Sequence, residues 1–342
     1  MCHIVAVFRE VKRVLRDDGT VFLNLGDSYA ANSNRGGGKA HSTLNAKRDE
    51  NGIVIGKSIV TREPSNYDLR AYGLKPKDLL MMPARVALAL QADGWWLRSD
   101  IVWAKSNPMP ESVTDRPTRS HEYIFLLSKS ERYFYDADAI REPQSERTLE
   151  RFGLNGSRTG NGPKQVDSPN GMIRDRAEFA KGMLPNGRNK RDVWTVNSEP
   201  TPEAHFATFP RKLIEPCILA GTSERGCCSE CGAPWARVTE TANRSRSFKD
   251  NGKGIDQRKA EGSGGRAGSI SSITTGWRRA CSHDAPSVPC LVFDPFIGSG
   301  TTGIVCERFG RRWVGLDLSF QYLSTIATRR TAQRGLRFAG AE

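Results

Sequence analysis

Hydrophobic residues recur along this chain in helical and extended patterns that alternate, and this alternation predicts a layered α/β fold. Residues 3–16 place apolar side chains at helical spacing, and the short apolar run 20–25 follows at once as a strand. The chain therefore opens on a helix that has no strand before it. The same reasoning predicts helices at 77–92, 211–219, 302–309 and the C-terminus, and strands at 95–103, 122–128, 290–294 and 313–318.

Three polar stretches interrupt this pattern and divide the chain. Residues 31–75 are predicted to be a flexible loop within a first half, 1–140, and residues 141–195 form a second polar segment. The remaining half combines 196–221 with 288–342, and residues 222–287 form a cysteine-bearing insert between its two parts.

Composition limits the classes of protein to consider. With 37% hydrophobic and 8% aromatic residues, the 342-residue chain has enough apolar material for a core. No apolar run approaches the roughly 18 residues of a membrane span, and no cleavable leader is evident, so we expect no membrane association and a cytoplasmic location.

The formal charge of +13 favours a nucleic-acid partner or basic surface loops. Its distribution is uneven, because residues 31–75, 141–195 and 236–280 carry net charges of +4, +4 and +6. The rest of the chain is close to neutral, as expected for a protein that contacts DNA through loops outside a folded core.

A glycine-rich loop between a predicted strand and a predicted helix carries the most chemical information. Gly298, Gly300 and Gly303 satisfy the G-x-G-x-x-G pattern, which permits a tight turn and close backbone approach to a ligand. Asp317 ends the next strand, 23 positions after Asp294, where a carboxylate accepts hydrogen bonds from ribose hydroxyls. The combination indicates a pocket for an adenosine nucleoside.

Two kinds of cofactor suit such a pocket. A dinucleotide needs a second βαβ half, but only 25 residues follow Asp317, and Asp294 would repel a pyrophosphate. S-adenosylmethionine carries a sulfonium and an α-ammonium group, which a carboxylate at position 294 favours. The sequence therefore predicts S-adenosylmethionine and disfavours a nucleotide-dependent oxidoreductase.

Residues 294–302, Asp-Pro-Phe-Ile-Gly-Ser-Gly-Thr-Thr, closely resemble the D-P-F-x-G-S-G-T-T signature of the amino-directed (N4-cytosine/N6-adenine) DNA methyltransferases. The chain is similar to the permuted group, in which the catalytic half precedes the cofactor half. The resemblance implies a Rossmann-like methyltransferase sheet in circularly permuted order, with polar loop insertions. It also implies transfer of a methyl group to the exocyclic amine of a base flipped out of double-stranded DNA. The residues it implies for the cofactor are Thr208, Phe209, Pro210, Asp294, Pro295, Phe296, Gly298, Ser299, Gly300, Thr301, Thr302 and Asp317.

Further segments extend the resemblance over nearly the whole chain outside the three polar stretches. Residues 205–210 are similar to the segment that closes over the methionine end of the cofactor, and 11–29 to the helix and strand after the catalytic motif. Residues 103–105, 119–129 and 192–194 resemble later strands and a junction, which makes 141–195 the expected target-recognition segment. Asp27 is expected to be a turn residue at a strand end.

One departure from the family concerns catalysis. Its tetrapeptide, Ser/Asp/Asn-Pro-Pro followed by an aromatic residue, belongs on a strand before the helix at 3–16, yet the sequence contains no Pro-Pro pair. Residues 107–110, Asn-Pro-Met-Pro, are the closest substitute but are misplaced and lack the aromatic residue. We expect an N-terminal truncation, assign no catalytic residue, and expect a chain that binds cofactor without catalysis. The target base, adenine or cytosine, and the oligomeric state stay open.

The cysteines suggest a second kind of site. Cys228 and Cys231 form a C-x-x-C-G turn, and Cys281 with His283 supplies a second pair, a ligand set that suits tetrahedral structural Zn²⁺. Cys227 is an alternative to Cys228, and reduced cysteines without metal are the alternative to a zinc site. The remaining cysteines, Cys2, Cys217, Cys290 and Cys306, are expected to be structural. A zinc-bearing DNA-binding protein with a vestigial methyltransferase fold is thus the alternative function.

Overall fold

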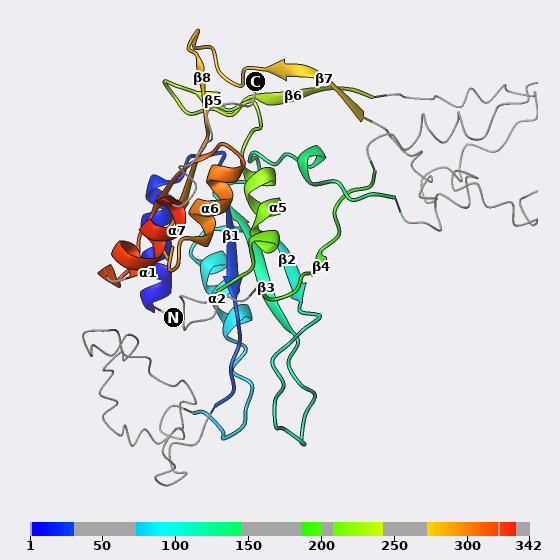
Figure 1. Ribbon diagram of the computed structural model, residues 1–342, viewed down its shortest axis with the longest axis vertical. Coiled ribbons are helices and arrows are strands. Elements are labelled where there is room, and N and C mark those ends of the chain that lie inside the picture. Colours follow the sequence, from blue (N-terminus) through cyan, green and yellow to red (C-terminus); the bar gives the residue numbers. More distant parts are fainter. Residues whose placement is uncertain are drawn as a thin grey trace, which may run out of the picture. The chain divides into compact units, whose positions relative to one another are not determined.

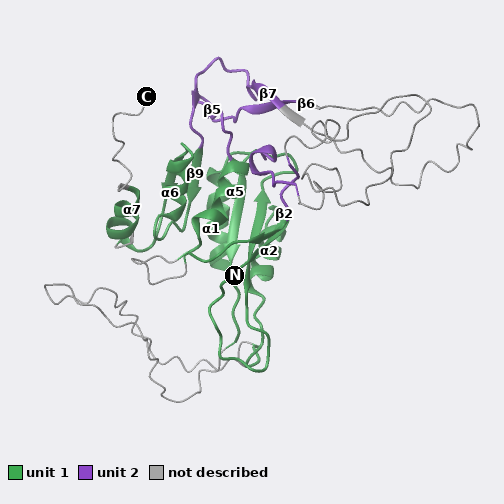
Figure 2. Ribbon diagram, turned by 45° about the vertical axis from the view of Figure 1, so that its right-hand side comes forward, with its two compact units in different colours: residues 1–134, 192–221, 291–342 green, residues 135–191, 222–290 purple. Residues whose placement is uncertain are grey.

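The structure is a computed structural model that describes residues 2–30, 73–144, 187–199, 208–241, 272–320 and 322–332. The chain divides into two compact units, one formed by residues 1–134, 192–221 and 291–342 and the other by 135–191 and 222–290 (Figure 2). Most of the predicted loop 31–75, the centre of the predicted recognition segment 141–195 and the middle of the insert lie outside the described residues.

A four-stranded mixed sheet forms the centre of the first unit (Figure 1). Its strands lie in the order β1-β3-β2-β4, where β3 is antiparallel to both β1 and β2, and β4 is parallel to β2. Their bounds are β1 Thr20–Leu25, β2 Trp96–Ala104, β3 His121–Ser128 and β4 Val193–Thr195. The helices that pack on this sheet are α1 (Cys2–Val14), α2 (Met82–Ala92) and α5 (Arg211–Gly221).

Helices cover both faces of this sheet. Both faces carry apolar side chains, because successive residues of a strand point to opposite sides. Leu23 of β1 packs in one buried cluster with residues of α1 and α2, among them Phe8 and Leu90. Its neighbour Phe22 packs against a second cluster, in which Leu213 of α5 meets residues of β2 and β3. Leu90 and Leu213 are fully buried, so truncating either side chain to alanine should cost about 2–5 kcal/mol.

A second, two-stranded sheet in the same unit pairs β9 (Leu291–Asp294) with β10 (Arg312–Gly315) in parallel. Helix α6 (Thr301–Arg308) connects them, and a π-helical segment, Tyr322–Ala327, leads into α7 (Thr328–Ala332). Val292 packs with α5 and α6, whereas Phe293 packs against the cluster of α1 and α2. The side chains of β9 therefore reach the same two layers as those of β1.

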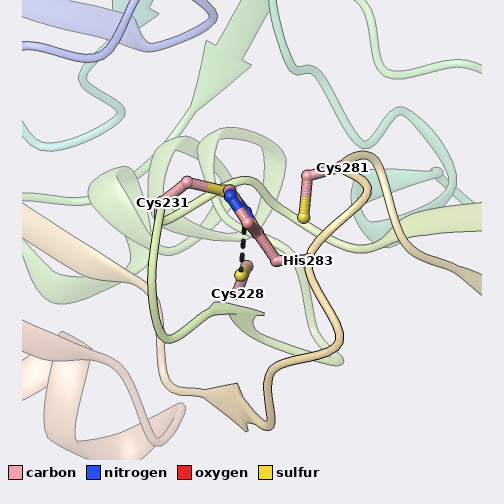
Figure 3. A group of neighbouring side chains, drawn as sticks. All are labelled: Cys228, Cys231, Cys281 and His283. Carbon is pink, nitrogen blue, oxygen red and sulfur yellow. Dashed lines mark hydrogen bonds between the residues drawn. The ribbon is translucent and has the colours of Figure 1, made fainter.

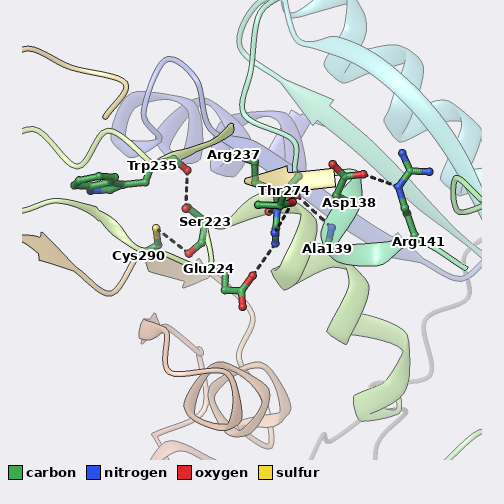
Figure 4. Close-up of polar contacts among 10 residues, drawn as sticks. Asp138, Ala139, Arg141, Ser223, Glu224, Trp235, Arg237, Thr274 and Cys290 are labelled. Carbon is green, nitrogen blue, oxygen red and sulfur yellow. Dashed lines mark hydrogen bonds and ion pairs between the residues drawn. The ribbon is translucent and has the colours of Figure 1, made fainter. Parts of the chain in front are cut away.

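The second unit is built from short ribbons around the insert. β5 (Cys227–Cys228) pairs with β8 (Ser287–Val288), β6 (Ala236–Thr241) pairs with β7 (Ser272–Arg278), and a short 3₁₀ helix spans Asp138–Ile140. Two links hold these parts together. One is a disulfide between Cys227 and Cys290, and the other is Arg237, which donates to the buried Asp136 at 2.8 Å and to Glu224 at 2.7 Å (Figure 4).

Two predicted boundaries were wrong, each for a local reason, and the terminal helix, predicted without bounds, has an irregular start. The helix predicted at 77–92 begins only at Met82, because Met81 has a left-handed backbone (φ 52°) and Pro83 favours the first turn. The strand predicted at 313–318 ends at Gly315, because its partner strand β9 ends at Asp294. Beyond Gly315, the Leu316 carbonyl accepts the N–H of Ile297 in the glycine loop and not one from a strand. The terminal helix begins with a π-helical segment.

The structure also contains a disulfide that the sequence analysis did not predict. Cys227, considered there as an alternative metal ligand, is bonded to Cys290, 63 positions away. None of the described helices is long and apolar enough to cross a membrane.

Candidate functional site

The glycine loop connects the end of β9 to the first turn of α6, and Asp294 fixes both of its ends. One oxygen of the Asp294 carboxylate accepts the backbone N–H of Phe296 at 2.9 Å, and the other accepts the Thr302 hydroxyl at 2.5 Å. Because Thr302 lies in the first turn of α6, the carboxylate ties the strand end to the helix start. The two hydrogen bonds accepted by Asp294 therefore fix the conformation of the loop.

Asp317 lies just beyond β10 and reaches the same loop. Its carboxylate accepts the N–H of Gly298 at 2.9 Å and the N–H of Ser319 at 2.8 Å. β9 and β10 are parallel, so Asp294 and Asp317 follow their carboxyl ends at one edge of the sheet. This edge is where ligands bind in open parallel sheets.

The three glycines of the motif serve different purposes. At Gly298 an added Cβ would meet only the carbonyl of Phe296, at 3.8 Å, so the backbone there is open to a ligand. At Gly300 the φ of +80° and the Cα of Ala327 at 3.1 Å leave little room for a side chain, and at Gly303 a Cβ would lie 2.8 Å from the Trp313 ring. Only the first glycine faces free space, and the other two pack the loop against the protein.

Large apolar side chains stand exposed beside the two carboxylates. Phe296 is 51% exposed, Leu318 is fully exposed and Phe320 is 80% exposed. Exposed aromatic and aliphatic groups next to hydrogen-bonding carboxylates provide the mixed surface that a nucleoside needs, with a flat apolar base and polar ribose hydroxyls.

Arg330 of α7 also contacts the loop, and no sequence pattern predicts this contact. Its guanidinium donates to the Ser299 carbonyl at 2.8 Å and to the Ser299 hydroxyl at 2.7 Å. It also lies 3.4 Å from the Thr301 hydroxyl. The terminal helix therefore holds the centre of the loop through one cation.

Thr208, Phe209 and Pro210 lead directly into α5. The carbonyl of Pro210 accepts from Leu213 at 3.0 Å, and Phe209 packs against the α5 face of the four-stranded sheet. Residues 201–207, including the predicted segment 205–207, lie outside the described residues.

The start of α5 forms an ion pair with the segment before it. Glu199 accepts the backbone N–H of Arg211 at 3.1 Å and pairs with the Arg211 guanidinium. The bond to Arg211 lowers the pKa of the Glu199 carboxyl, and the charge of Arg330 lowers it further.

Asp27 is a structural residue at the end of β1, as expected. It is almost completely buried and accepts the backbone N–H groups of Ser28 and Met82, each at 2.9 Å. Arg119 lies 3.4 Å from its second oxygen. In the Asn-Pro-Met-Pro segment, Asn107 accepts the Ser198 N–H at 2.8 Å.

The predicted metal ligands come together in the second unit. The donor atoms of Cys228, Cys231, Cys281 and His283 all lie within 4.8 Å of one another (Figure 3). Backbone N–H groups, first that of Cys231 and also that of Glu230, hydrogen-bond the Cys228 sulfur and lower the pKa of its thiol to about 7. Cys227, the sequence alternative to Cys228, is occupied by its disulfide.

A family model described as DNA methylase, of the N6/N4 methyltransferase type, matches residues 3–229 and 290–328. The chain is 35% identical to the type II methyltransferase M.SmaI of Serratia marcescens, over 95% of this chain and 72% of that protein. It is 34% identical to M.Cfr9I of Citrobacter freundii, over 96% and 70% of the respective chains. Among solved structures, the PvuII cytosine-N4-specific DNA methyltransferase matches 98% of this chain and 72% of its own, with 14% identity and a TM-score of 0.45.

Proposed function

The chain belongs to the family of N6/N4-type DNA methylases. We propose that it binds S-adenosylmethionine at residues 294–303 for methylation of an exocyclic amine in DNA, and that the transfer step itself requires the family's Pro-Pro tetrapeptide, which this sequence lacks. The observation that carries the proposal is the pair of carboxylates, Asp294 and Asp317, that bracket the glycine loop. When bound, S-adenosylmethionine would supply a methyl group activated by its sulfonium: the methyl carbon is transferred to the amine nitrogen, the neutral thioether S-adenosylhomocysteine leaves, and the nitrogen loses a proton. This chemistry needs neither a metal nor a catalytic cysteine.

The chain's own residues can hold each part of this cofactor. Asp317 offers lone pairs to ribose hydroxyls, and the open face of Gly298 admits the ligand against the backbone. Exposed Phe296 gives the adenine ring an apolar surface. Asp294 adds a negative charge near the cationic methionine end. Charged hydrogen bonds of this kind contribute about 1.5–3 kcal/mol each.

Methyl transfer also requires a group that holds the target amine, and no residue of this sequence is assigned to that task. The family's tetrapeptide contains Pro-Pro, and the sequence has no such pair. Among the described strands, β1 pairs only with β3, and β9 pairs only with β10, so each has a free edge.

The proposal is tested by following tritiated methyl transfer to unmethylated duplex DNA. The chain as printed is expected to bind S-adenosylmethionine and to transfer no label. A variant extended ahead of Cys2 by a strand with a Ser-Pro-Pro-Tyr tetrapeptide is expected to gain transfer. Label transferred by the unextended chain would show that the tetrapeptide is unnecessary and would contradict this account of the site.

The base that accepts the methyl group is read from the product of the same reaction. Nucleoside mass spectrometry separates N4-methylcytosine from N6-methyladenine. The residues of this chain do not predict which of the two is formed. Double-stranded DNA is the proposed substrate, with recognition assigned to residues 141–195.

A second candidate is a zinc-bearing DNA-binding protein that retains a vestigial methyltransferase fold. It is favoured by the Cys/His cluster together with the missing Pro-Pro pair. Under this alternative the chain binds duplex DNA, whereas S-adenosylmethionine produces no heat in calorimetry and the extended variant transfers no label.

A further inference from the structure

The insert of the second unit has a core too small to account for its order. The one buried cluster found among its described residues consists of Cys228, Ala233 and Ala285, with Cys231 and Cys281 packed against it. Two alanines and three cysteines bury little apolar surface. Small modules with so little core are generally held by disulfides or by a metal.

The disulfide closes only the base of the insert. It joins Cys227 to Cys290, which lie beside the paired strands β5 and β8. The two segments that carry Cys231, Cys281 and His283 lie beyond it, and neither Cys231 nor Cys281 takes part in a disulfide. The disulfide therefore does not join these two segments at the point where the four side chains meet.

We propose that Cys228, Cys231, Cys281 and His283 bind one structural Zn²⁺ ion. A tetrahedral ion with Zn–S bonds of about 2.3 Å sets its ligand atoms roughly 3.8 Å apart. The Cys228 sulfur lies 3.9 Å from Nδ1 of His283, and all four donors fall within 4.8 Å of one another (Figure 3). The cluster thus has nearly the size of a zinc coordination sphere.

The first pair of ligands lies on a turn built to present sulfur. Gly232 has a φ of +70° and its N–H donates to the Cys228 carbonyl at 2.8 Å, while the Cys228 N–H donates to Ala233 at 2.8 Å. This closes the Cys-x-x-Cys-Gly segment so that both sulfurs lie on one side. Backbone N–H groups directed at the Cys228 sulfur would stabilise a metal-bound thiolate.

The second pair is held by groups around the cluster. Arg279 donates to the His283 carbonyl at 3.1 Å and to Asp284 at 2.5 Å, which fixes the turn after Cys281. Nε2 of His283 lies 3.8 Å from the Glu230 carboxylate, so Nδ1 remains directed at the sulfurs. Three thiolates and Zn²⁺ carry a net charge of −1, which the cation of Arg279 offsets.

Most of the proposed ligands lie outside the part of the chain that the family model matches. The model matches residues 3–229 and resumes at 290, so Cys231, Cys281 and His283 are not among the matched residues. The proposed zinc site lies in the insert, next to the paired strands β5 and β8 and between strands β6 and β7 and the disulfide in sequence.

The test measures metal on the full chain, kept with a thiol-free phosphine reductant and stripped with a chelator. Titrated Co²⁺ is expected to bind one ion per chain, with the visible absorption of a tetrahedral thiolate site, and Zn²⁺ is expected to displace it. Cys231→Ser and Cys281→Ser should weaken binding by more than about 100-fold. His283→Cys should keep one ion, because a fourth thiolate replaces the imidazole.

Two matched variants make the result specific. Cys2→Ser removes an exposed thiol that is distant in sequence from the cluster, and the variant should leave one ion bound. Cys290→Ser should do the same, because Cys290 is not one of the four proposed ligands. Absence of stoichiometric metal from the wild-type chain overturns the proposal, as does full retention of metal by Cys281→Ser. These readouts are independent of S-adenosylmethionine.

Discussion

Gly300 shows how closely single residues constrain the loop that would bind the cofactor. Its φ of +80° is accessible to glycine at little cost, and its missing side chain admits Ala327 of the π-helical segment. Both requirements act at once, because the residue caps α6 and touches the C-terminal segment.

Gly300→Ala should therefore destabilise the protein by more than the left-handed backbone alone explains. A non-glycine residue in this conformation costs about 1–2 kcal/mol, and the Cβ would add a contact at 3.1 Å to backbone. Gly310→Ala is the matched control, since Gly310 has a φ of +65° but nothing within 4 Å of an added Cβ. Denaturant unfolding measures both, and equal losses would show that the contact with Ala327 does not matter.

Cys306 is a second residue whose behaviour follows from its surroundings. The side chain is completely buried in α6, and this burial, with the nearby charge of Asp294, raises the pKa of its thiol to about 12. The thiol is thus neutral in the folded protein at any pH below that value. The raised pKa contributes to the free energy of unfolding. This contribution is fully present below the ordinary thiol pKa and is lost as the pH rises toward 12, because the thiol of the unfolded chain ionises first.

We expect Cys306 to resist alkylation in the folded protein at pH 8–9 and to react after unfolding. Cys2 is exposed on α1 and should react at once under the same conditions. Mass spectrometric mapping of alkylated peptides measures both sites in a single sample. Equal labelling of Cys306 and Cys2 in the native protein would contradict the burial of α6.

At the scale of elements, α7 contacts the glycine loop although the two are distant in sequence. Arg330 bonds Ser299 across 31 positions, and Ala327 packs on Gly300. The π-helical segment and α7 together thus hold the turn between β9 and α6 in place.

Arg330→Ala should weaken S-adenosylmethionine binding by about 2- to 10-fold, because hydrogen bonds that position the loop contribute about 0.5–1.5 kcal/mol. Arg329→Ala is the matched control, since the neighbouring side chain is exposed. Calorimetric titration of both variants gives the comparison. If the two bind equally well, α7 does not support the site.

Local sequence predicted most elements and little of what joins them. The apolar runs at 20–25 and 122–128 correspond to β1 and β3, and family membership was confirmed through residues 294–302 and the relatives. The start of α2 was misplaced because Met81 adopts a left-handed conformation that no pattern marks.

Sequence patterns did not predict the contacts between segments that are distant in the chain. Arg330 carries no motif, and eight cysteines allow many pairings, so the bond between Cys227 and Cys290 was not predicted. The Cys-x-x-Cys-Gly turn and the Cys281/His283 pair are each local patterns, so the sequence predicts both pairs, and their four donor atoms lie together. Their role as ligands stays a prediction, as does the permuted order of the sheet.

At the scale of the whole molecule, the charge of +13 is distributed in a way that suits DNA. Several basic residues of the described regions are neutralised by partners: Arg188, Lys190 and Arg191 surround Glu142, and Arg237 bridges Asp136 and Glu224. Much of the excess lies in residues 31–75, 141–195 and 236–280, which are mostly outside the described residues.

The central claim is that the glycine loop and its two carboxylates bind S-adenosylmethionine, and calorimetric titration of the cofactor into the full chain tests it most directly. The wild-type chain is expected to show one saturable site, and Asp317→Ala should raise the dissociation constant by about 10- to 150-fold through loss of charged hydrogen bonds to the ribose. Asp100→Ala, which changes a carboxylate on β2 away from the loop, should leave the constant unchanged. No binding heat with the wild-type chain, or an unchanged constant in Asp317→Ala, would contradict the account.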